Sequence, residues 1–171
     1  MVKKKDSLAH YRSKRNFKTS PEPEKSSQKN NAKKLIFVIQ KHDASHLHYD
    51  LRLQHGKVLL SWAVPKGPPK KIGEKRLAVQ TEDHPLTYAH FAGTIPQGEY
   101  GGGTVEIWDY GTYQNIKEKN GKKVAMKTCL QEGHIEVQLD GTKLRGAYAL
   151  IRTNFGDGKS WLLLKMHKKE K

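Results

Sequence analysis

Cysteine and long apolar runs are almost absent from this chain. Its 171 residues include one cysteine, Cys129, so no intrachain disulfide can form and nothing suggests a cysteine-based zinc site. We expect Cys129 to be a small buried apolar residue rather than a nucleophile. No apolar run is long enough for a signal peptide or a membrane span. The sequence therefore predicts a soluble, cytoplasmic protein with no membrane partner.

Acidic and apolar residues are also scarce. There are 17 Asp and Glu against 32 Lys and Arg, which gives a net charge of +15, and apolar residues make up 35% of the chain. A positive surplus of this size favours a polyanionic partner through counterion release and long-range attraction, so nucleic acid is the leading expectation. The length suits one domain with a real core. Nothing in the sequence indicates an obligate dimer, so we expect a monomer.

Residues 1–34 differ in composition from the remainder. They contain eleven Lys and Arg but only three acidic residues, and the stretch around Pro21–Asn31 has few apolar side chains. Such a segment cannot bury enough surface to fold alone, so we predict a flexible basic N-terminal arm at 1–34. Its two aromatic residues, Tyr11 and Phe17, could dock on the folded domain or stack on a base. A solvated tail with little role is the alternative.

Residues 35–171 give signals that are almost all β. Short β-rich segments alternate with turn residues, and 65–69, with three prolines, must be a loop. One weak helical signal lies at 124–130, and 117–123 is expected to be a charged loop. About nine short strands at close spacing predict an all-β fold, a closed or nearly closed barrel of about eight to nine strands with minor short helices. The expected strands are 35–39, 46–53, 57–64, 76–81, 104–108, a short strand after a turn at 109–111, 134–139, 144–152 and 160–166.

The most informative stretch is 40–53, whose second half alternates polar and apolar residues. His46, His48, Asp50 and Arg52 share one face of the expected strand, and four apolar or aromatic residues occupy the other. Same-face neighbours lie roughly 6.5–7 Å apart at Cα, so His48 and Asp50 can converge on one ion. His42, just before the strand, would supply a third ligand, while His46 is expected to lie one step outside the site. Two imidazoles and a carboxylate suit Mn, Fe, Co or Zn.

Arg52 follows on the same face, where a guanidinium beside a metal would hold phosphate. We expect this polar face to line either the barrel interior or a concave groove. Three alternatives to a phosphate-binding metal site stay open. The face could be a hydrogen-bonded polar strand without a metal, the barrel could be a nucleic-acid-binding module with structural histidines, or the triad could serve a non-haem iron oxygenase.

Two further residues are candidates by position. Lys66 projects from the proline-rich loop and is either solvated or a phosphate contact. His84 lies between an acidic pair and a proline, where a neighbouring carboxylate can orient an imidazole for catalysis. The glycines at 98–103 do not form a phosphate-binding loop, because no Gly-Lys-Ser/Thr follows and a strand comes next. They are expected to permit a tight bend or close packing at a barrel corner.

The chain resembles the 3′-phosphoesterase module of bacterial ligase D over nearly its whole length. The resemblance rests on 40–53, on Ser-Trp-Ala-Val-Pro-Lys-Gly at 61–67, on Glu-Asp-His-Pro-Leu at 82–86 and on 91–109. It implies a manganese-dependent enzyme, with Co²⁺ or Zn²⁺ as substitutes. Such an enzyme removes a 3′-terminal ribonucleoside from a DNA primer strand and then the 3′-phosphate, leaving a 3′-OH. The implied substrate is a primer–template duplex with a 3′ ribonucleotide or 3′-phosphate end. An ATP-dependent DNA ligase and a DNA-end-binding protein are implied as partners acting in trans.

The resemblance also implies roles for individual residues. His42, His48 and Asp50 would hold the metal, and Arg52 and His84 would bind the phosphate, with Tyr88 assisting catalysis. Lys66, Arg76 and Arg15 would contribute to phosphate or substrate binding, with Gln40 and Glu82 as supporting residues. The chain departs from the family pattern where Asn16 replaces an aspartate, where Ala92 replaces an acidic residue and where Tyr113 stands for the more usual Trp.

Overall fold

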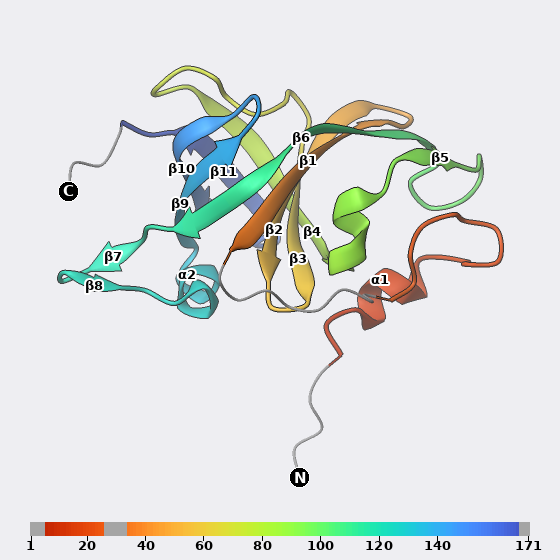
Figure 1. Cartoon of the computed structure of the whole chain (residues 1–171), viewed down its shortest axis with the longest axis horizontal. Coiled ribbons are helices and arrows are strands. Elements are labelled where there is room, and N and C mark those ends of the chain that lie inside the picture. The colour runs from red at the N-terminus through yellow and green to blue at the C-terminus, as the bar shows by residue number, and fades with distance from the viewer. Residues whose placement is uncertain (1–5, 26–33, 168–171) are drawn as a thin grey trace, which may run out of the picture.

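β-strands form most of the computed structural model, which describes residues 6–25 and 34–167 (Figure 1). Within 34–167, eight strands close into an antiparallel barrel in the order β1-β2-β3-β4-β11-β10-β9-β6, because β6 also pairs with β1. This confirms the predicted all-β barrel. The barrel strands are β1 (Leu35–Asp43), β2 (Leu47–His55), β3 (Val58–Val64), β4 (Lys75–Pro85), β6 (Gly103–Asn115), β9 (His134–Gly141), β10 (Arg145–Arg152) and β11 (Ser160–Lys165).

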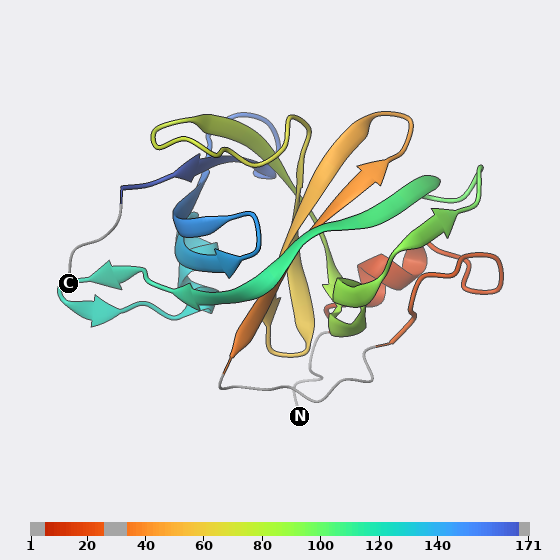
Figure 2. The same ribbon diagram turned by 45° about the horizontal axis from the view of Figure 1, so that its top comes forward.

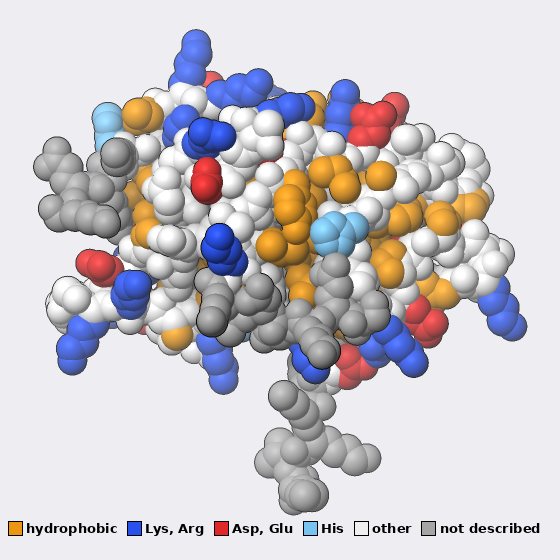
Figure 3. All heavy atoms as spheres, in the orientation of Figure 1, with side chains coloured by type: hydrophobic (Ala, Val, Ile, Leu, Met, Phe, Trp, Pro, Cys, Tyr) orange, Lys and Arg blue, Asp and Glu red, His pale blue; other side chains and the backbone are white. Residues whose placement is uncertain are grey.

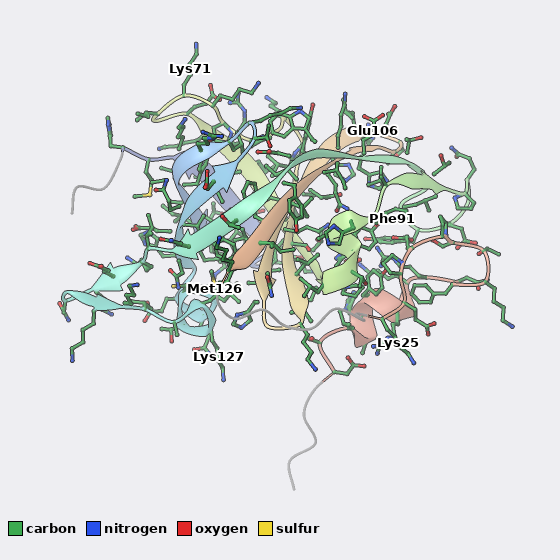
Figure 4. All side chains as sticks on the ribbon, viewed as in Figure 1. Lys25, Lys71, Phe91, Glu106, Met126 and Lys127 are labelled. Atoms are coloured by element: carbon green, nitrogen blue, oxygen red, sulfur yellow. The ribbon has the colours of Figure 1, made fainter. Side chains whose placement is uncertain are left out.

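Shorter strands and helices lie outside the eight-stranded barrel. The β5 strand (Gly93–Ile95) pairs with one end of β6, and Figure 2 shows β6 running across the molecule from β5 toward β7 (Glu118–Lys119). The β7 strand pairs with β8 (Lys122–Lys123) inside the segment predicted to be a charged loop. The predicted helix is present as α2 (Met126–Glu132), with Met126 buried and Lys127 pointing away from the barrel (Figure 4). Neither α1 (Ala9–Ser13) nor the 3₁₀-helix η1 (Leu86–His90) is predicted by the sequence pattern.

The turn predicted at 109–111 is wrong, because β6 continues through it. A β-bulge shifts the β1–β6 register between Ile39 and Gln40. The Asp109 carboxylate accepts backbone N–H bonds at 2.8–3.1 Å from residues 142–144 of the distant β9–β10 connection. Gly111 permits a close approach of β6 to β9, since a Cβ there would lie 2.1 Å from the Asp140 carbonyl oxygen. Aspartate and glycine therefore serve a long-range contact here, although together they are typical of a turn.

The barrel interior is filled by the apolar faces of its strands. One continuous buried cluster takes side chains from all eight, with Trp62 and Trp161 packed edge to face at a centroid distance of 5.6 Å. Leu51 and Leu53 of β2 belong to this cluster. Because neighbouring residues of a strand point to opposite sides, the polar residues of β2 face outward. The polar face therefore does not line the barrel interior, and it instead lines a hollow on the outer side of the barrel wall, the second of the two expected locations.

A second, smaller cluster covers part of that outer face. Val38 of β1 and Leu59 of β3 pack there against residues of η1 and against Tyr11 of α1, whose side chain is fully buried. Thus residues 6–25, part of the predicted flexible arm, lie against the barrel. Figure 1 shows α1 beside η1 on this side of the molecule. Residues 1–5 and 26–33 of the arm lie outside the described residues, and the boundary between arm and barrel at 34/35 stays a prediction.

No helix within 6–25 or 34–167 combines the length and apolar character needed to cross a membrane. Figure 3 shows Lys and Arg side chains spread around the edge of one face, with hydrophobic side chains across its middle.

Candidate metal centre and phosphate-binding cavity

The β1–β2 hairpin brings the predicted metal ligands together. Its register pairs His42 with His48 and Gln40 with Asp50, so these side chains share the outer face of two adjacent strands. His42 belongs to β1 itself rather than to a segment that precedes the strand, so it faces His48 directly. The sequence pattern of β2 alone could not show this cross-strand pairing.

His42, His48 and Asp50 form a group suited to a divalent metal. One ligand atom from each lies within 4.8 Å of the others. Nδ1 of His42 is 3.7 Å from one carboxylate oxygen of Asp50, and Nε2 of His48 is 3.4 Å from the other. The nitrogen and oxygen donors match the ligands of Mn, Fe, Co and Zn.

Each imidazole is oriented by a backbone carbonyl. Nε2–H of His42 donates to the Gly101 oxygen at 2.7 Å, and Nδ1–H of His48 donates to the His46 oxygen at 3.1 Å. These bonds fix opposite tautomers and leave Nδ1 of His42 and Nε2 of His48 free to coordinate, as carbonyls behind the ligands commonly do at metal sites. The His46 side chain is exposed and lies outside the group, as expected, while its carbonyl has this orienting role.

Asp50 remains ionised in this setting. Burial alone would raise the pKa of its carboxyl, but the Arg52 guanidinium, 3.4 Å away, lowers it, and the net pKa lies well below the usual range. A hydrogen bond to Asp50 raises the pKa of His48 above its ordinary value. The charge distribution therefore favours a cation among these three side chains.

Arg52 is held by Gln40, which is completely buried. Nε of Arg52 donates to Oε1 of Gln40 at 2.6 Å, and Nε2 of Gln40 donates to the backbone oxygens of Tyr88 and Phe91 at 2.8 and 3.0 Å. Figure 4 shows Phe91 at the end of η1, close to the barrel wall. The guanidinium also lies over the Tyr88 ring, 4.8 Å from its centroid. One amide thus fixes both the arginine and the short helix that carries Tyr88.

His84 lies next to Arg52 as a neutral imidazole. Burial and the charges of Arg52 and Arg15 lower the pKa of His84 well below its ordinary value. Nδ1–H donates to the Glu82 backbone oxygen at 2.8 Å, and Nε2 accepts from Nη2 of Arg15 at 3.3 Å. Nη1 of Arg52 lies 3.2 Å from Nδ1. Two guanidiniums and an imidazole therefore line one cavity, an arrangement whose charge and geometry suit the oxygens of a phosphate.

The N-terminal segment supplies Arg15 and Glu22 to this site, and Glu82 of β4 holds the arginine from the barrel side. Nε of Arg15 donates to Glu22 at 2.9 Å, and Nη1 donates to Glu82 at 3.1 Å. Glu22 also accepts at 2.6 Å from the Tyr88 hydroxyl, whose pKa burial raises well above its usual value. Although burial acts to raise it, the pKa of Glu82 is lowered overall by hydrogen bonds, including those from Arg15 and Lys14. The buried carboxylates hold the arginine in one position facing His84.

These side chains line one cavity of about 310 Å³. Its wall also includes residues from the turn between β5 and β6. The lining residues are Arg15, Glu22, His42, Ala44, Ser45, His48, Asp50, Arg52, Ala63, Thr81, Glu82, His84, Tyr88, Ile95, Tyr100 and Gly101. Gln40 supports the cavity from behind. Most of the residues singled out in the sequence are thus brought together.

Two predicted residues lie elsewhere. Among the described residues that line the cavity, neither Lys66 nor Arg76 is found. Lys66 is exposed in the loop after β3, and Nη2 of Arg76 forms a 3.0 Å ion pair with Glu74. Their contact with phosphate stays a prediction. Asn16 is also outside the cavity, where its Oδ1 accepts the Lys18 backbone N–H at 3.1 Å, a bond that needs no carboxylate.

Sequence reasoning does not find Glu22, Gly101 or Tyr100. Glu22 lies between two prolines in a stretch poor in apolar residues, so no local pattern indicates its burial. Gly101 is expected only to permit a bend. Its φ of +77° does favour glycine, but its carbonyl also orients the candidate metal ligand His42. Glu22 contacts Tyr88, and Gly101 contacts His42, across more than fifty positions of sequence. Gly101 also acts through its backbone oxygen, which a sequence pattern does not reveal.

Comparisons with known proteins identify the family of this chain. Residues 40–152 match the family model described as the DNA ligase D 3′-phosphoesterase domain. The chain is 48% identical over 160 residues to the multifunctional non-homologous end joining protein LigD of Pseudomonas aeruginosa, covering 92% of this chain and 18% of that protein. It is 45% identical over 161 residues to the protein of the same name from Mycolicibacterium smegmatis, covering 94% of this chain and 21% of the relative. The chain thus spans about a fifth of the length of these relatives. On the matched residues, this chain belongs to the family of DNA ligase D 3′-phosphoesterase domains.

Proposed function

We propose that the chain is a metal-dependent phosphoesterase that acts on the 3′ end of a DNA strand. It would remove a 3′-terminal ribonucleoside and then the remaining 3′-phosphate, leaving a 3′-OH suited to repair by end joining. The observation that carries the proposal is one cavity in which a two-histidine, one-aspartate group adjoins Arg52, Arg15 and His84. Family membership and the net charge of +15 support a nucleic-acid substrate.

His42, His48 and Asp50 would hold the metal, with Mn²⁺ as the proposed ion and Co²⁺ or Zn²⁺ as substitutes. When bound, such an ion supplies Lewis-acid polarisation of a phosphate and lowers the pKa of a coordinated water. The donor set and the two carbonyl-oriented imidazoles fit it.

The remaining residues would bind and orient the phosphate. Arg52 and Arg15 both line the cavity, and each lies beside a different ring nitrogen of His84. Their guanidiniums would stabilise negative charge that develops on the non-bridging oxygens. Gln40 and Glu22 prevent the two arginines from relaxing toward solvent. Tyr88 keeps its proton and lies under the Arg52 guanidinium, so it acts as a neutral wall and hydrogen-bond donor.

Partners outside the chain are also part of the proposal. The relatives are named as multifunctional end-joining proteins, and this chain corresponds to about a fifth of their length. We propose that it works as a monomer with an ATP-dependent DNA ligase and a DNA-end-binding protein acting in trans.

The test uses a primer–template duplex whose primer ends in two ribonucleotides, so that a 2′-OH flanks the scissile phosphate on both sides. Protein stripped of metal is assayed before and after Mn²⁺ is added, and products are resolved on a gel. Asp50→Asn is compared with Asp140→Asn, whose side chain is 73% exposed and remote from the cavity. We expect Mn²⁺-dependent conversion to a 3′-phosphate and then a 3′-OH, lost in Asp50→Asn and kept in Asp140→Asn.

Different outcomes would identify the alternatives. A duplex that binds without cleavage in all conditions would favour a binding module with structural histidines. Turnover that needs Fe²⁺, O₂ and an oxo acid, with no phosphate released, would favour an iron oxygenase.

A further inference from the structure

Tyr100 forms an exposed aromatic wall of the cavity. It lies in the turn between β5 and β6, and 45% of its surface is exposed, although it lines the cavity beside buried polar groups. The Arg15 guanidinium lies 5.2 Å from the centroid of its ring, but Glu22 and Glu82 hold that arginine by hydrogen bonds, so the position of Arg15 does not depend on the ring. An accessible ring at the mouth of a phosphate-binding cavity is suited to stack on a flat group that enters with the phosphate.

The position of Tyr100 is fixed from two directions. The next residue, Gly101, accepts the hydrogen bond from the metal-ligand candidate His42 at 2.7 Å. The preceding residue, Glu99, accepts at 2.7 Å from Thr19 in the N-terminal segment. Nζ of Lys14 lies 4.7 Å from the ring centroid and 3.3 Å from the hydroxyl. A ring held in this way loses little freedom when a ligand stacks on it, which favours binding.

The cavity is sized for the end of a strand. Its volume of about 310 Å³ is at the lower limit of small-molecule sites, roughly 300–1,000 Å³. Buried side chains hold the phosphate end, whereas Tyr100 lies at the open side. A phosphodiester bound there would place its last nucleoside at this opening.

We propose that Tyr100 is the subsite for the base of the 3′-terminal nucleoside, the group released in the diester step. This inference rests on the proposed function. In that step water adds to phosphorus and the P–O5′ bond to the terminal nucleoside breaks. The released nucleoside takes a proton on O5′, and the strand keeps a 3′-phosphate. In the second step no nucleoside leaves, so the Tyr100 subsite is unused.

The test separates the two steps. Three primer–templates share one primer sequence and end in a ribonucleoside, in a ribose that lacks its base, or in a 3′-phosphate. Tyr100→Ala and Tyr100→Phe are compared with Tyr110→Ala, another exposed tyrosine, which lies on β6 outside the cavity. For the ribonucleoside substrate we expect Tyr100→Ala to raise KM about ten-fold with kcat little changed, as loss of one base–aromatic stack implies. Tyr100→Phe keeps the ring and should resemble wild type, as should Tyr110→Ala.

The base-free substrate closes a double-mutant cycle. Loss of the base should raise KM about ten-fold in the wild type, as loss of the same stack implies, and cause no further rise in Tyr100→Ala. Hydrolysis of the 3′-phosphate substrate should be the same in all variants.

Three results would overturn the inference. An equal loss on ribonucleoside and 3′-phosphate substrates would show that Tyr100 only supports Arg15 or the turn that holds His42. Unchanged KM in Tyr100→Ala would show that the ring does not contact the base. A wild-type protein inactive on all three substrates would overturn the proposed function and this inference with it.

Discussion

Replacing Gln40 with leucine should reduce both stability and activity, because one buried amide makes three hydrogen bonds. Its loss leaves Nε of Arg52 and the backbone oxygens of Tyr88 and Phe91 without their partner. A buried group that loses its partner costs about 1–3 kcal/mol, and more when charged. Leucine recovers part of this through apolar burial. The free energy of unfolding should therefore fall by about 3–5 kcal/mol.

Activity should fall further than stability alone explains. Without Gln40 the Arg52 guanidinium can shift toward Asp50, and a displacement of about 1 Å at a catalytic group costs roughly 100-fold in rate. We expect kcat/KM for the 3′-phosphate substrate to fall about 100-fold at a temperature where the variant is fully folded.

The assay is urea unfolding followed by circular dichroism, together with steady-state kinetics. Gln80→Leu is the matched control, because Gln80 accepts one bond, from Trp161 at 3.1 Å, and lies outside the cavity lining. It should lose about 1 kcal/mol and keep its activity. If Gln40→Leu and Gln80→Leu lose the same free energy and retain equal activity, the reasoning from the three bonds is refuted.

Three further perturbations test separate parts of the structure. Gly101→Ala places a Cβ on a residue with a φ of +77°, 3.4 Å from Cε1 of His42. The affinity for Mn²⁺, measured by calorimetry, should therefore fall roughly ten-fold. An unchanged affinity would contradict the orienting role of the Gly101 carbonyl. Burial raises the pKa of Asp83 to about 6 from 3.8, so its stabilising contribution is present below about pH 4 and is lost as pH rises through 6. Asp83→Asn should raise the melting temperature at about pH 7.5 but not at about pH 4, and equal shifts at both would argue against this titration. Tyr11→Ala removes a fully buried ring and should lower the free energy of unfolding by about 3–5 kcal/mol. Residues 6–25 should then become sensitive to limited proteolysis, and activity should fall because Arg15 is displaced. Continued protection from the protease would show that the remaining contacts hold this segment on the barrel.

The barrel and the part of the cavity formed by β2 are predictable from local pattern, whereas Arg15, Gln40, Glu82 and Tyr88 are indicated only by the resemblance to a family. Alternation in β2 assigns Asp50 and Arg52 to one face, and the structure places both on that face. The local pattern does not show which residues far apart in the sequence contact each other. The middle of β6 resembles a turn in sequence, since Asp109 and Gly111 act through contacts with the β9–β10 connection that no local pattern shows.

The N-terminal segment illustrates the same limit. Its composition predicts an arm that cannot fold alone, and this is compatible with a segment that becomes ordered against an existing surface. Tyr11 and Arg15 obtain their burial from η1 and β4, which the composition of 1–34 does not describe. Buried charges such as Glu22 are recognisable only when their partners are known.

The residues of β2 alternate between an outward polar face and an inward apolar face, and this alternation has a consequence for folding. A slip of β2 by one position against β1 would move Asp50 into the core and Leu51 into the cavity. In a closed barrel, such a slip would also break the hydrogen-bonded pairing of β2 with β3. A barrel in which only some strands have the correct register is therefore strongly disfavoured. For the proposed metal site, the number of ions bound per chain after refolding would therefore equal the fraction of barrels with the correct register.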